Sequence, residues 1–178
     1  MTGVIPVDKS EAARAAFEEM VRDNEERILR YAAEMTGSVE DARDMVQTCL
    51  LKAWNVYKEG ARPDNARAWL YRITHNEIAN LLRSKRIRRE VHQSIVLQIP
   101  QDKDAAVLHM LASESFLAVQ RLDEPYKEAI SLHYFHGLSL QETAGVLGCP
   151  IGTAKTYVAR GLQTLRKMLG GKLDKEKE

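Results

Sequence analysis

The segment from Ile151 to Lys172 carries five basic side chains and no acidic one, whereas a helix that only faces water usually mixes both signs. With helical spacing, four residues near its start share one face: Lys155, Thr156, Ala159 and Arg160. A lysine or arginine on such a face can donate hydrogen bonds to guanine O6 and N7, and a threonine hydroxyl can serve a base edge or a phosphate. These four residues are therefore predicted to contact nucleic acid.

Two short helices are predicted to hold this face in place. The first is expected to begin after Ser139, because Ser139 and Glu142 have the spacing of a capping box, and to end at Gly148. Pro150 suits a first helical turn, so the second helix is expected to begin between Pro150 and Thr153. Its buried stripe is expected to contain Ile151, Ala154, Val158, Leu162 and Leu165. This spacing is typical of a helix-turn-helix, whose second helix enters the major groove with its N-terminal part.

An ordinary helical hairpin with a hydrated outer face is the alternative explanation, but such a face usually includes carboxylates. A second basic cluster favours nucleic acid as well. The segment RSKRIRR, Arg83–Arg89, places five bases in seven residues, while residues 1–50 hold 11 acids against 6 bases. The net charge of +1 therefore conceals basic patches that suit a polyanionic partner.

The N-terminal half has the apolar periodicity of three amphipathic helices. The first is expected to end at Gly37. The second follows Ser38, which is expected to cap it, and runs for about five turns. The third is expected to be capped by Asp64 or Asn65.

Residues 93–103 interrupt the helical pattern, because a short apolar run there is broken by Pro100 and followed by charges. They are predicted to form a flexible linker. A second helical unit is expected to begin near Asp104 and to break around residues 122–125. The predicted fold is all-α, with two small helical domains, residues 1–92 and 104–178, of which the C-terminal one contains the helix-turn-helix.

Catalytic, metal and cofactor sites are not predicted. The five histidines show no metal-ligand spacing with carboxylates, and the sequence contains no glycine-rich phosphate loop. Cys49 and Cys149 have no paired spacing either, so we expect small buried side chains. No apolar run approaches the roughly 20 residues that cross a bilayer, and the N-terminus has no signal-peptide layout. We expect a cytoplasmic protein with no membrane insertion, no cofactor and no enzymatic activity.

From about Phe17 to Leu169, the chain resembles the extracytoplasmic-function (ECF) sigma factors, the smallest members of the bacterial sigma-70 family. EDARDMVQTCLLKAW resembles the helix of sigma domain 2 that binds the polymerase clamp, and ARAWLYRITHNEIANLLRSKRIRR resembles the helix that melts promoters and reads the −10 element. LDEPYKEAISLHYFHGLSLQETAGVLGCPIGTAKTYVARGLQTLRKML resembles domain 4, which reads the −35 element. The resemblance implies an alternative sigma factor that binds core RNA polymerase and directs promoter-specific transcription initiation.

The resemblance also implies three sets of contact residues. Core-polymerase contacts fall on residues that lie off the apolar stripe of their helix: Asp41, Asp44 and Gln47. Contacts with the −10 element fall on Asn76, Asn80, Arg83, Lys85 and Arg86. Contacts with the −35 element fall on the four residues singled out above, Lys155, Thr156, Ala159 and Arg160. The implied partners are core RNA polymerase, promoter DNA and an anti-sigma factor.

The loop from Gly60 to Asn65 matches the segment that captures a base extruded from the non-template strand. Extruding a base costs a few kcal/mol, which a pocket returns by stacking and edge hydrogen bonds. Because this loop contains no aromatic residue, such a pocket is expected to rely on polar and backbone contacts.

Two other binding functions are compatible with the residues. A stand-alone helix-turn-helix transcriptional regulator, with an N-terminal bundle that dimerises or senses a ligand, would bind a palindromic duplex as a dimer without polymerase. A sigma-like decoy would sequester a regulator without contacting DNA, so its groove-facing bases would be dispensable.

Overall fold

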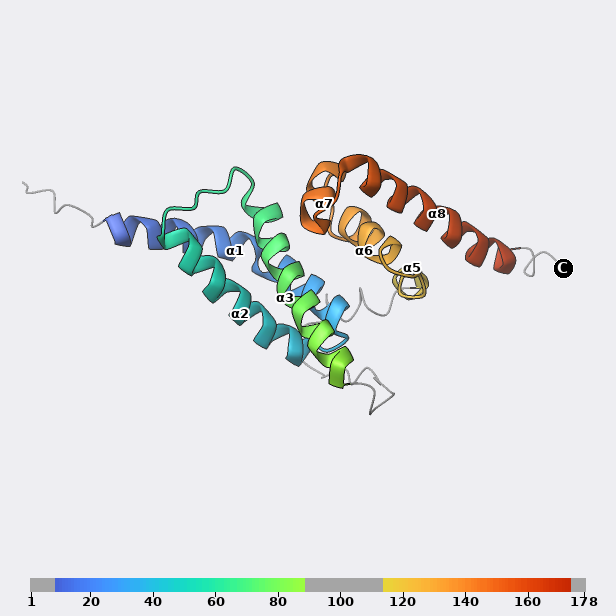
Figure 1. Cartoon of the computed structure of the whole chain (residues 1–178), viewed down its shortest axis with the longest axis horizontal. Coiled ribbons are helices and arrows are strands. Elements are labelled where there is room, and N and C mark those ends of the chain that lie inside the picture. Colours follow the sequence, from blue (N-terminus) through green and yellow to red (C-terminus); the bar gives the residue numbers. More distant parts are fainter. Residues whose placement is uncertain (1–8, 89–113, 174–178) are drawn as a thin grey trace, which may run out of the picture. The chain divides into compact units, whose positions relative to one another are not determined.

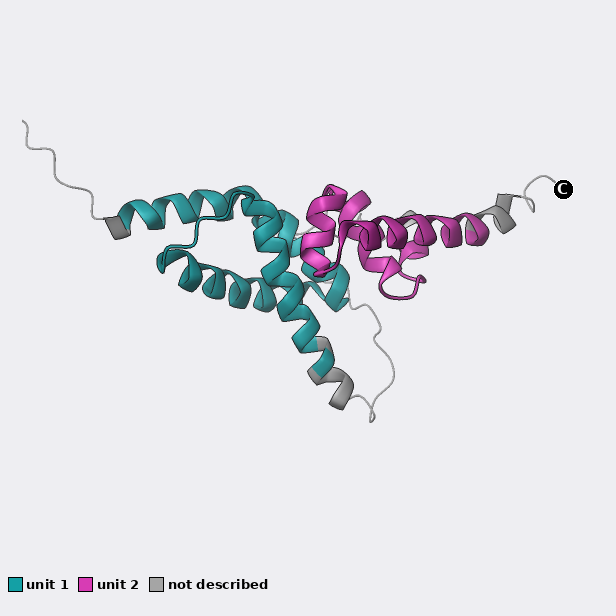
Figure 2. Ribbon diagram, turned by 45° about the horizontal axis from the view of Figure 1, so that its top comes forward, with its two compact units in different colours: residues 1–96 teal, residues 97–178 magenta. Residues whose placement is uncertain are grey.

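The computed structural model describes residues 9–88 and 114–173, and every regular element in these ranges is a helix (Figure 1). The chain divides into two compact units, Met1–Val96 and Leu97–Glu178, each with its own core (Figure 2). This confirms the predicted all-α fold with two small helical domains. The predicted linker, residues 93–103, and the predicted helix start near Asp104 lie outside the described residues. None of the described helices has the length and apolar character needed to cross a bilayer.

The first unit contains α1 (Lys9–Thr36), α2 (Val39–Lys58) and α3 (Ala66–Arg88), and each helix packs against the other two (Figure 1). Alanines without exposed surface lie on the inner faces of α1 and α2 and allow the helices to approach closely: Ala32, Ala33, Ala42 and Ala53. Larger buried side chains fill the remaining core: Ile28, Tyr31, Leu70, Tyr71 and Ile78. Burial of this apolar area is the main source of stability for the bundle.

The ends of these helices follow from local sequence. Gly37 adopts φ 73°, a left-handed conformation that glycine adopts readily, and it terminates α1. The Ser38 hydroxyl oxygen accepts a hydrogen bond from the amide three residues later, at 3.1 Å, as the N-cap of α2. The Asn65 side-chain oxygen accepts one from the Ala68 amide at 2.9 Å. Asn65, rather than the alternative Asp64, therefore supplies the side-chain cap of α3.

The described residues of the second unit form these helices: α5 (Glu114–Val119), α6 (Tyr126–Ile130), the π-helical segment η1 (Ser131–Phe135), α7 (Leu140–Leu147) and α8 (Ile151–Leu173). The gap between α5 and α6 confirms the predicted break around residues 122–125. Buried side chains from three of these helices and the connection after α5 form one cluster: Val119, Leu122, Ala129, Ile130 and Val158.

The turn between α7 and α8 has the predicted helix-turn-helix geometry. Ser139 and Glu142 form a complete capping box, with hydrogen bonds of 3.2 Å and 2.6 Å. Gly148 ends α7 in the left-handed conformation, at φ 64°. The Thr153 amide donates to the Pro150 carbonyl at 2.9 Å as α8 begins. Local contacts therefore determine where α7 begins and ends and where α8 begins.

Candidate nucleic-acid and protein interfaces

The outward face of α8 carries the four residues predicted to contact nucleic acid, and all are exposed: Lys155, Thr156, Ala159 and Arg160. The opposite face holds Ala154 and Val158, which are buried in the unit. The Thr156 hydroxyl donates to the Gly152 carbonyl at 2.9 Å, so its oxygen meets a partner as an acceptor. The face therefore presents two cationic donors, one acceptor and one small apolar side chain.

The buried stripe of α8 differs from the prediction at one end. Ile151 was expected to be buried, but it is 41% exposed. It is the first residue of α8, so no preceding turn shields it, and it does not belong to the core cluster. Leu162 and Leu165 are partly buried against that cluster, as expected. Gly161 is buried as well, because α8 lies so close to Ile130 that a side chain there would contact it.

The three predicted polymerase contacts on α2 are exposed, but they border hollows on different sides of α2. Asp41 and Asp44 line a surface hollow between α2 and α3, whose other lining residues are Met45, Thr48, Glu77, Asn80 and Leu81. Gln47 instead lines hollows on the α1 side of α2. The structure therefore separates the two aspartates from Gln47, and it brings them beside a residue predicted to contact DNA.

One of the hollows that Gln47 lines is apolar, and its importance was not predicted from the sequence. It is also lined by Phe17, Leu50, Leu51 and Trp54. Leu51 is 66% exposed and lies beside the partly buried Trp54 in this hollow. At the rim, Arg14 and Glu18 pair at 2.8 Å. Apolar surface with a charged rim suits a protein partner. The only sequence signal for this surface is that Leu51 lies off the buried stripe of α2.

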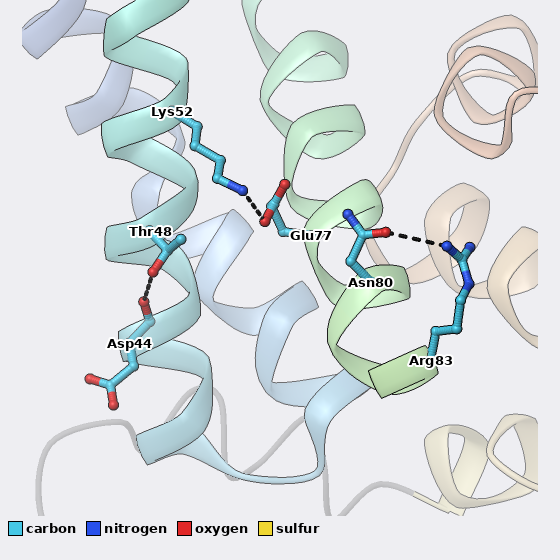
Figure 3. A network of polar contacts seen from close by, with 6 residues as sticks. All are labelled: Asp44, Thr48, Lys52, Glu77, Asn80 and Arg83. Carbon is cyan, nitrogen blue, oxygen red and sulfur yellow. Dashed lines mark hydrogen bonds and ion pairs between the residues drawn. The ribbon is translucent and has the colours of Figure 1, made fainter. Parts of the chain in front are cut away.

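Three of the predicted −10 contacts lie on the exposed surface of α3. Asn76, Asn80 and Arg83 are exposed, and Arg83 Nη1 approaches Asn80 Oδ1 at 3.5 Å, a long hydrogen bond (Figure 3). An ion pair of 2.5 Å between Lys52 and Glu77 connects α2 to α3 beside this face. The predicted contacts Lys85 and Arg86 belong to α3, but their side chains lie outside the described part of the structure.

The two cysteines differ in burial. Cys49 is 2% exposed under α3, and burial raises the pKa of its thiol to about 11. Cys149, in the turn before α8, is only half-buried, so the expectation of a buried side chain is correct for Cys49 and only partly correct for Cys149. Among the described residues, no group of three or more His, Cys, Asp or Glu side chains can hold a metal ion.

Comparison with known proteins matches each unit to a different family. Sigma-70 region 2 matches residues 20–88, and Sigma-70, region 4 matches residues 117–165. The chain is 32% identical over 176 residues to the ECF RNA polymerase sigma factor SigL of Mycobacterium tuberculosis, covering 92% of this chain and 97% of SigL. It is 28% identical over 173 residues to SigE of Mycolicibacterium smegmatis, covering 94% of this chain and 67% of SigE. The sigma factor RpoE from Bartonella quintana, solved in complex with the anti-sigma factor NepR, has a TM-score of 0.64 at 25% identity, covering 88% of this chain and 96% of RpoE.

Proposed function

Because the chain belongs to the extracytoplasmic-function (ECF) RNA polymerase sigma factors, we propose that its two helical units contact different parts of one transcription complex. The chain is an alternative sigma factor, which directs transcription initiation to chosen promoters. We place its domains at residues 1–92 and 104–178, joined by a linker at residues 93–103. In this proposal, the first domain binds core RNA polymerase and the −10 element, and the second reads the −35 element.

The exposed cationic face of α8 is the observation that carries the proposal. Lys155 and Arg160 lie five positions apart on the side opposite the buried Ala154 and Val158, so both can reach one groove without disturbing the core. An arginine can donate two hydrogen bonds to one guanine, and a lysine can neutralise a phosphate. Ala159 can contact a thymine methyl group. No acid in α8 opposes an approaching phosphate.

The −10 contacts are proposed for the exposed face of α3. Asn76 and Asn80 are one turn apart, and asparagine side chains pair with adenine edges. The Asn80 oxygen accepts a long hydrogen bond of 3.5 Å from Arg83, but its second lone pair and the amide nitrogen remain for a base. Lys85 and Arg86 extend the cationic part of this helix and are proposed to contact phosphates. The loop from Gly60 to Asn65 is proposed to hold an extruded base.

Core polymerase is proposed to contact α2 both at the hollow between α2 and α3 and at the apolar hollow on the α1 side. Asp41 and Asp44 offer two carboxylates to cationic side chains. Gln47 borders the apolar hollow with Leu51, which offers a surface to apolar side chains of the same partner. A partner that uses both hollows must therefore combine basic and apolar groups.

An anti-sigma factor is proposed as a further partner, because RpoE from Bartonella quintana, which resembles this chain, was solved in complex with one. The chain itself is proposed to supply no catalytic residue and to act in the cytoplasm, where promoter DNA and polymerase occur. The alternative of a stand-alone regulator is not favoured, because both matched regions and the curated relatives above are those of sigma factors.

Run-off transcription with bacterial core RNA polymerase tests the proposal. A promoter that depends on its −35 element is first selected from a randomised library. The double variant Lys155→Ala/Arg160→Ala is expected to lose transcription from this promoter, because it lacks the cations of the reading face. Arg166→Ala/Lys167→Ala is the matched control, since it removes two exposed cations from a later turn of α8. Wild-type initiation by the Lys155→Ala/Arg160→Ala variant would contradict the proposal.

A further inference from the structure

Arg62, in the loop between α2 and α3, is held against the C-terminal end of α2. Its Nη1 atom donates hydrogen bonds to the main-chain oxygens of Tyr57 and Ala61, each at 2.7 Å. Its Cζ atom lies over the Tyr57 ring, 4.1 Å from the ring centroid, which is a cation–π contact. Two hydrogen bonds and a ring contact therefore hold the guanidinium in one place.

The ring beneath Arg62 belongs to the core of the first unit. Tyr57 is 8% exposed, and its centroid lies 5.3 Å from that of Phe17 and 6.5 Å from that of Trp54. The loop itself is anchored at its start, where Gly60, at φ 111°, donates its amide hydrogen to the Tyr57 carbonyl at 3.0 Å. The guanidinium therefore contacts a ring that is itself packed in an aromatic cluster of the core.

Arg62 remains an exposed residue although its guanidinium contacts the Tyr57 ring. The group is planar, the Tyr57 ring covers one of its two faces, and the Arg62 residue is exposed. Arginine planes stack on unpaired nucleobases, and their charge attracts the adjacent phosphates. A guanidinium held over an aromatic ring by an exposed residue has the chemistry of a stacking platform.

We propose that the outer face of the Arg62 guanidinium stacks on one base extruded from the non-template strand of the promoter. The inference rests on the proposed −10 function of the first unit, and it names the residue against which the base packs. The loop lacks an aromatic residue, and Arg62, supported by Tyr57 from α2, takes its place. Stacking that the base loses on leaving the duplex is thereby partly restored.

The competing role for Arg62 is a plain phosphate contact, which needs charge but no plane. Arg62→Lys separates the two roles, because lysine keeps the charge and can still donate to the Tyr57 carbonyl but has no flat face. Lys58→Ala is the matched control for charge, since it removes an exposed cation from the last turn of α2.

The experiment measures binding of the holoenzyme, assembled from the full chain and bacterial core RNA polymerase, to a fork-junction promoter with a single-stranded −10 region. The promoter sequence is one selected from a randomised library by run-off transcription. In a set of otherwise identical probes, one non-template base at a time is replaced by an abasic site. For each base, the effect of an Arg62 substitution on the intact probe is compared with its effect on the probe that lacks that base. The difference between the two effects is the coupling between Arg62 and the base, as in a double-mutant cycle.

Arg62→Ala is expected to weaken binding to the intact probe about fivefold or more, and to have no effect on the probe that lacks the stacked base. Arg62→Lys is expected to lose as much as Arg62→Ala. Lys58→Ala is expected to change binding by the same factor on every probe. An Arg62→Ala effect spread evenly over all probes, or wild-type binding by Arg62→Lys, would overturn the inference.

Asn80→Ala distinguishes failure of this inference from failure of the proposed function. If Asn80→Ala and the abasic sites weaken binding while Arg62 shows no preference for one base, only the inference fails. If neither Asn80→Ala nor any abasic site weakens binding, the first unit does not read the −10 strand, and both fail.

Discussion

Asp44 of α2 and Asn80 of α3 line the same surface hollow, although the two residues are proposed to contact different partners. A carboxylate repels phosphate, so a DNA strand that reaches Asn80 is expected to approach with its bases toward the protein and its phosphates away from Asp44. The Thr48 hydroxyl donates to the Asp44 main-chain oxygen at 3.0 Å and leaves the carboxylate uninvolved (Figure 3). If both proposed contacts form, the hollow lies where the polymerase surface and the DNA surface meet.

Reversing the charge at Asp44 should affect polymerase binding more than stability. Asp44→Arg is expected to raise the Kd for core enzyme by roughly 30-fold, or about 2 kcal/mol, because it places a cation where the partner is proposed to be basic. The free energy of unfolding should change by about 0.5 kcal/mol or less, since the side chain is exposed. Fluorescence titration of labelled chain with core polymerase, together with urea unfolding, measures both.

Asp23→Arg is the matched control, because Asp23 is an exposed aspartate on α1 that borders none of the hollows described on α2. It should leave the Kd for core enzyme unchanged. Equal effects of the two substitutions would indicate a general loss of electrostatic attraction, and the clamp contact proposed for Asp44 would be wrong.

Lys155 and Arg160 should have separable roles on α8. If Arg160 makes a bidentate base contact, Arg160→Ala costs about 1–3 kcal/mol on the preferred promoter and relaxes the preference at one −35 base pair. If Lys155 mainly neutralises phosphate, Lys155→Ala weakens all sequences alike and reduces the salt slope by about one counterion. Competition binding of holoenzyme to −35 variants at several salt concentrations measures both. An unchanged salt slope and unchanged preference in both variants would make the face a passive scaffold.

The helix-turn-helix was predictable from sequence because each of its determinants is local. The Ser139–Glu142 capping box, the left-handed Gly148 and Pro150 all act within a few residues, and the structure shows each as expected. The exposed face of α8 follows from helical periodicity once those ends are known. The one error in the buried stripe, Ile151, occurs at a helix end, where periodicity does not tell which residues have a neighbour to cover them.

Relationships between helices were not predictable in the same way. The shared hollow of Asp44 and Asn80, and the exposure of Leu51 beside Trp54, depend on how α1, α2 and α3 pack. The placement of Arg62 over Tyr57 depends on the path of a loop that begins with a glycine at positive φ. These features arise from tertiary packing, which a pattern along one helix does not record.

Thr143 of α7 offers a way to stabilise the second unit. Its hydroxyl oxygen is buried and has no hydrogen-bond partner among the described residues. Thr143→Val replaces the hydroxyl with a methyl group of similar size and should stabilise the unit by about 1 kcal/mol. Thr74→Val is the contrasting change, because the buried Thr74 hydroxyl donates to Leu70 at 3.0 Å and its loss should cost about 1 kcal/mol. Amide hydrogen exchange of peptides from each helix gives both values, and faster exchange in the Thr143→Val variant would contradict the first.

Two helical glycines of the second unit should respond in opposite directions to alanine. Gly145 of α7 has open space around it, so Gly145→Ala should stabilise the helix by about 0.5–1 kcal/mol. A methyl group at Gly161 of α8 would lie 2.8 Å from Ile130 Cγ1, and the displacement this requires should outweigh the gain in helix propensity. Thermal melting measures both changes. A higher melting temperature for Gly161→Ala would mean that α6 and α8 can separate without cost.

Alkaline pH should weaken the first unit through Cys49. Burial raises the pKa of this thiol from its ordinary value of about 9 to about 11, so between these values the unfolded chain has released a proton that the folded chain still holds. Rising pH therefore favours unfolding: the stabilisation is complete below about pH 9 and is lost as the pH rises through 11. Cys49→Ala lowers stability at pH 8 by leaving a small cavity, but it should lose less stability between pH 9 and 11 than the wild type.

Urea unfolding between pH 8 and 11, followed by the Trp54 and Trp69 fluorescence of the first unit, measures this slope. Tyr71 adds to it in every variant, because burial raises the pKa of its hydroxyl to about 12. Cys149→Ala is the control, since Cys149 lies in the other unit and is only half-buried, and it should leave the slope unchanged. If Cys49→Ala and Cys149→Ala both show the wild-type slope, the Cys49 thiol does not stay protonated as the fold requires, and the alkaline loss must come from Tyr71 or from lysines.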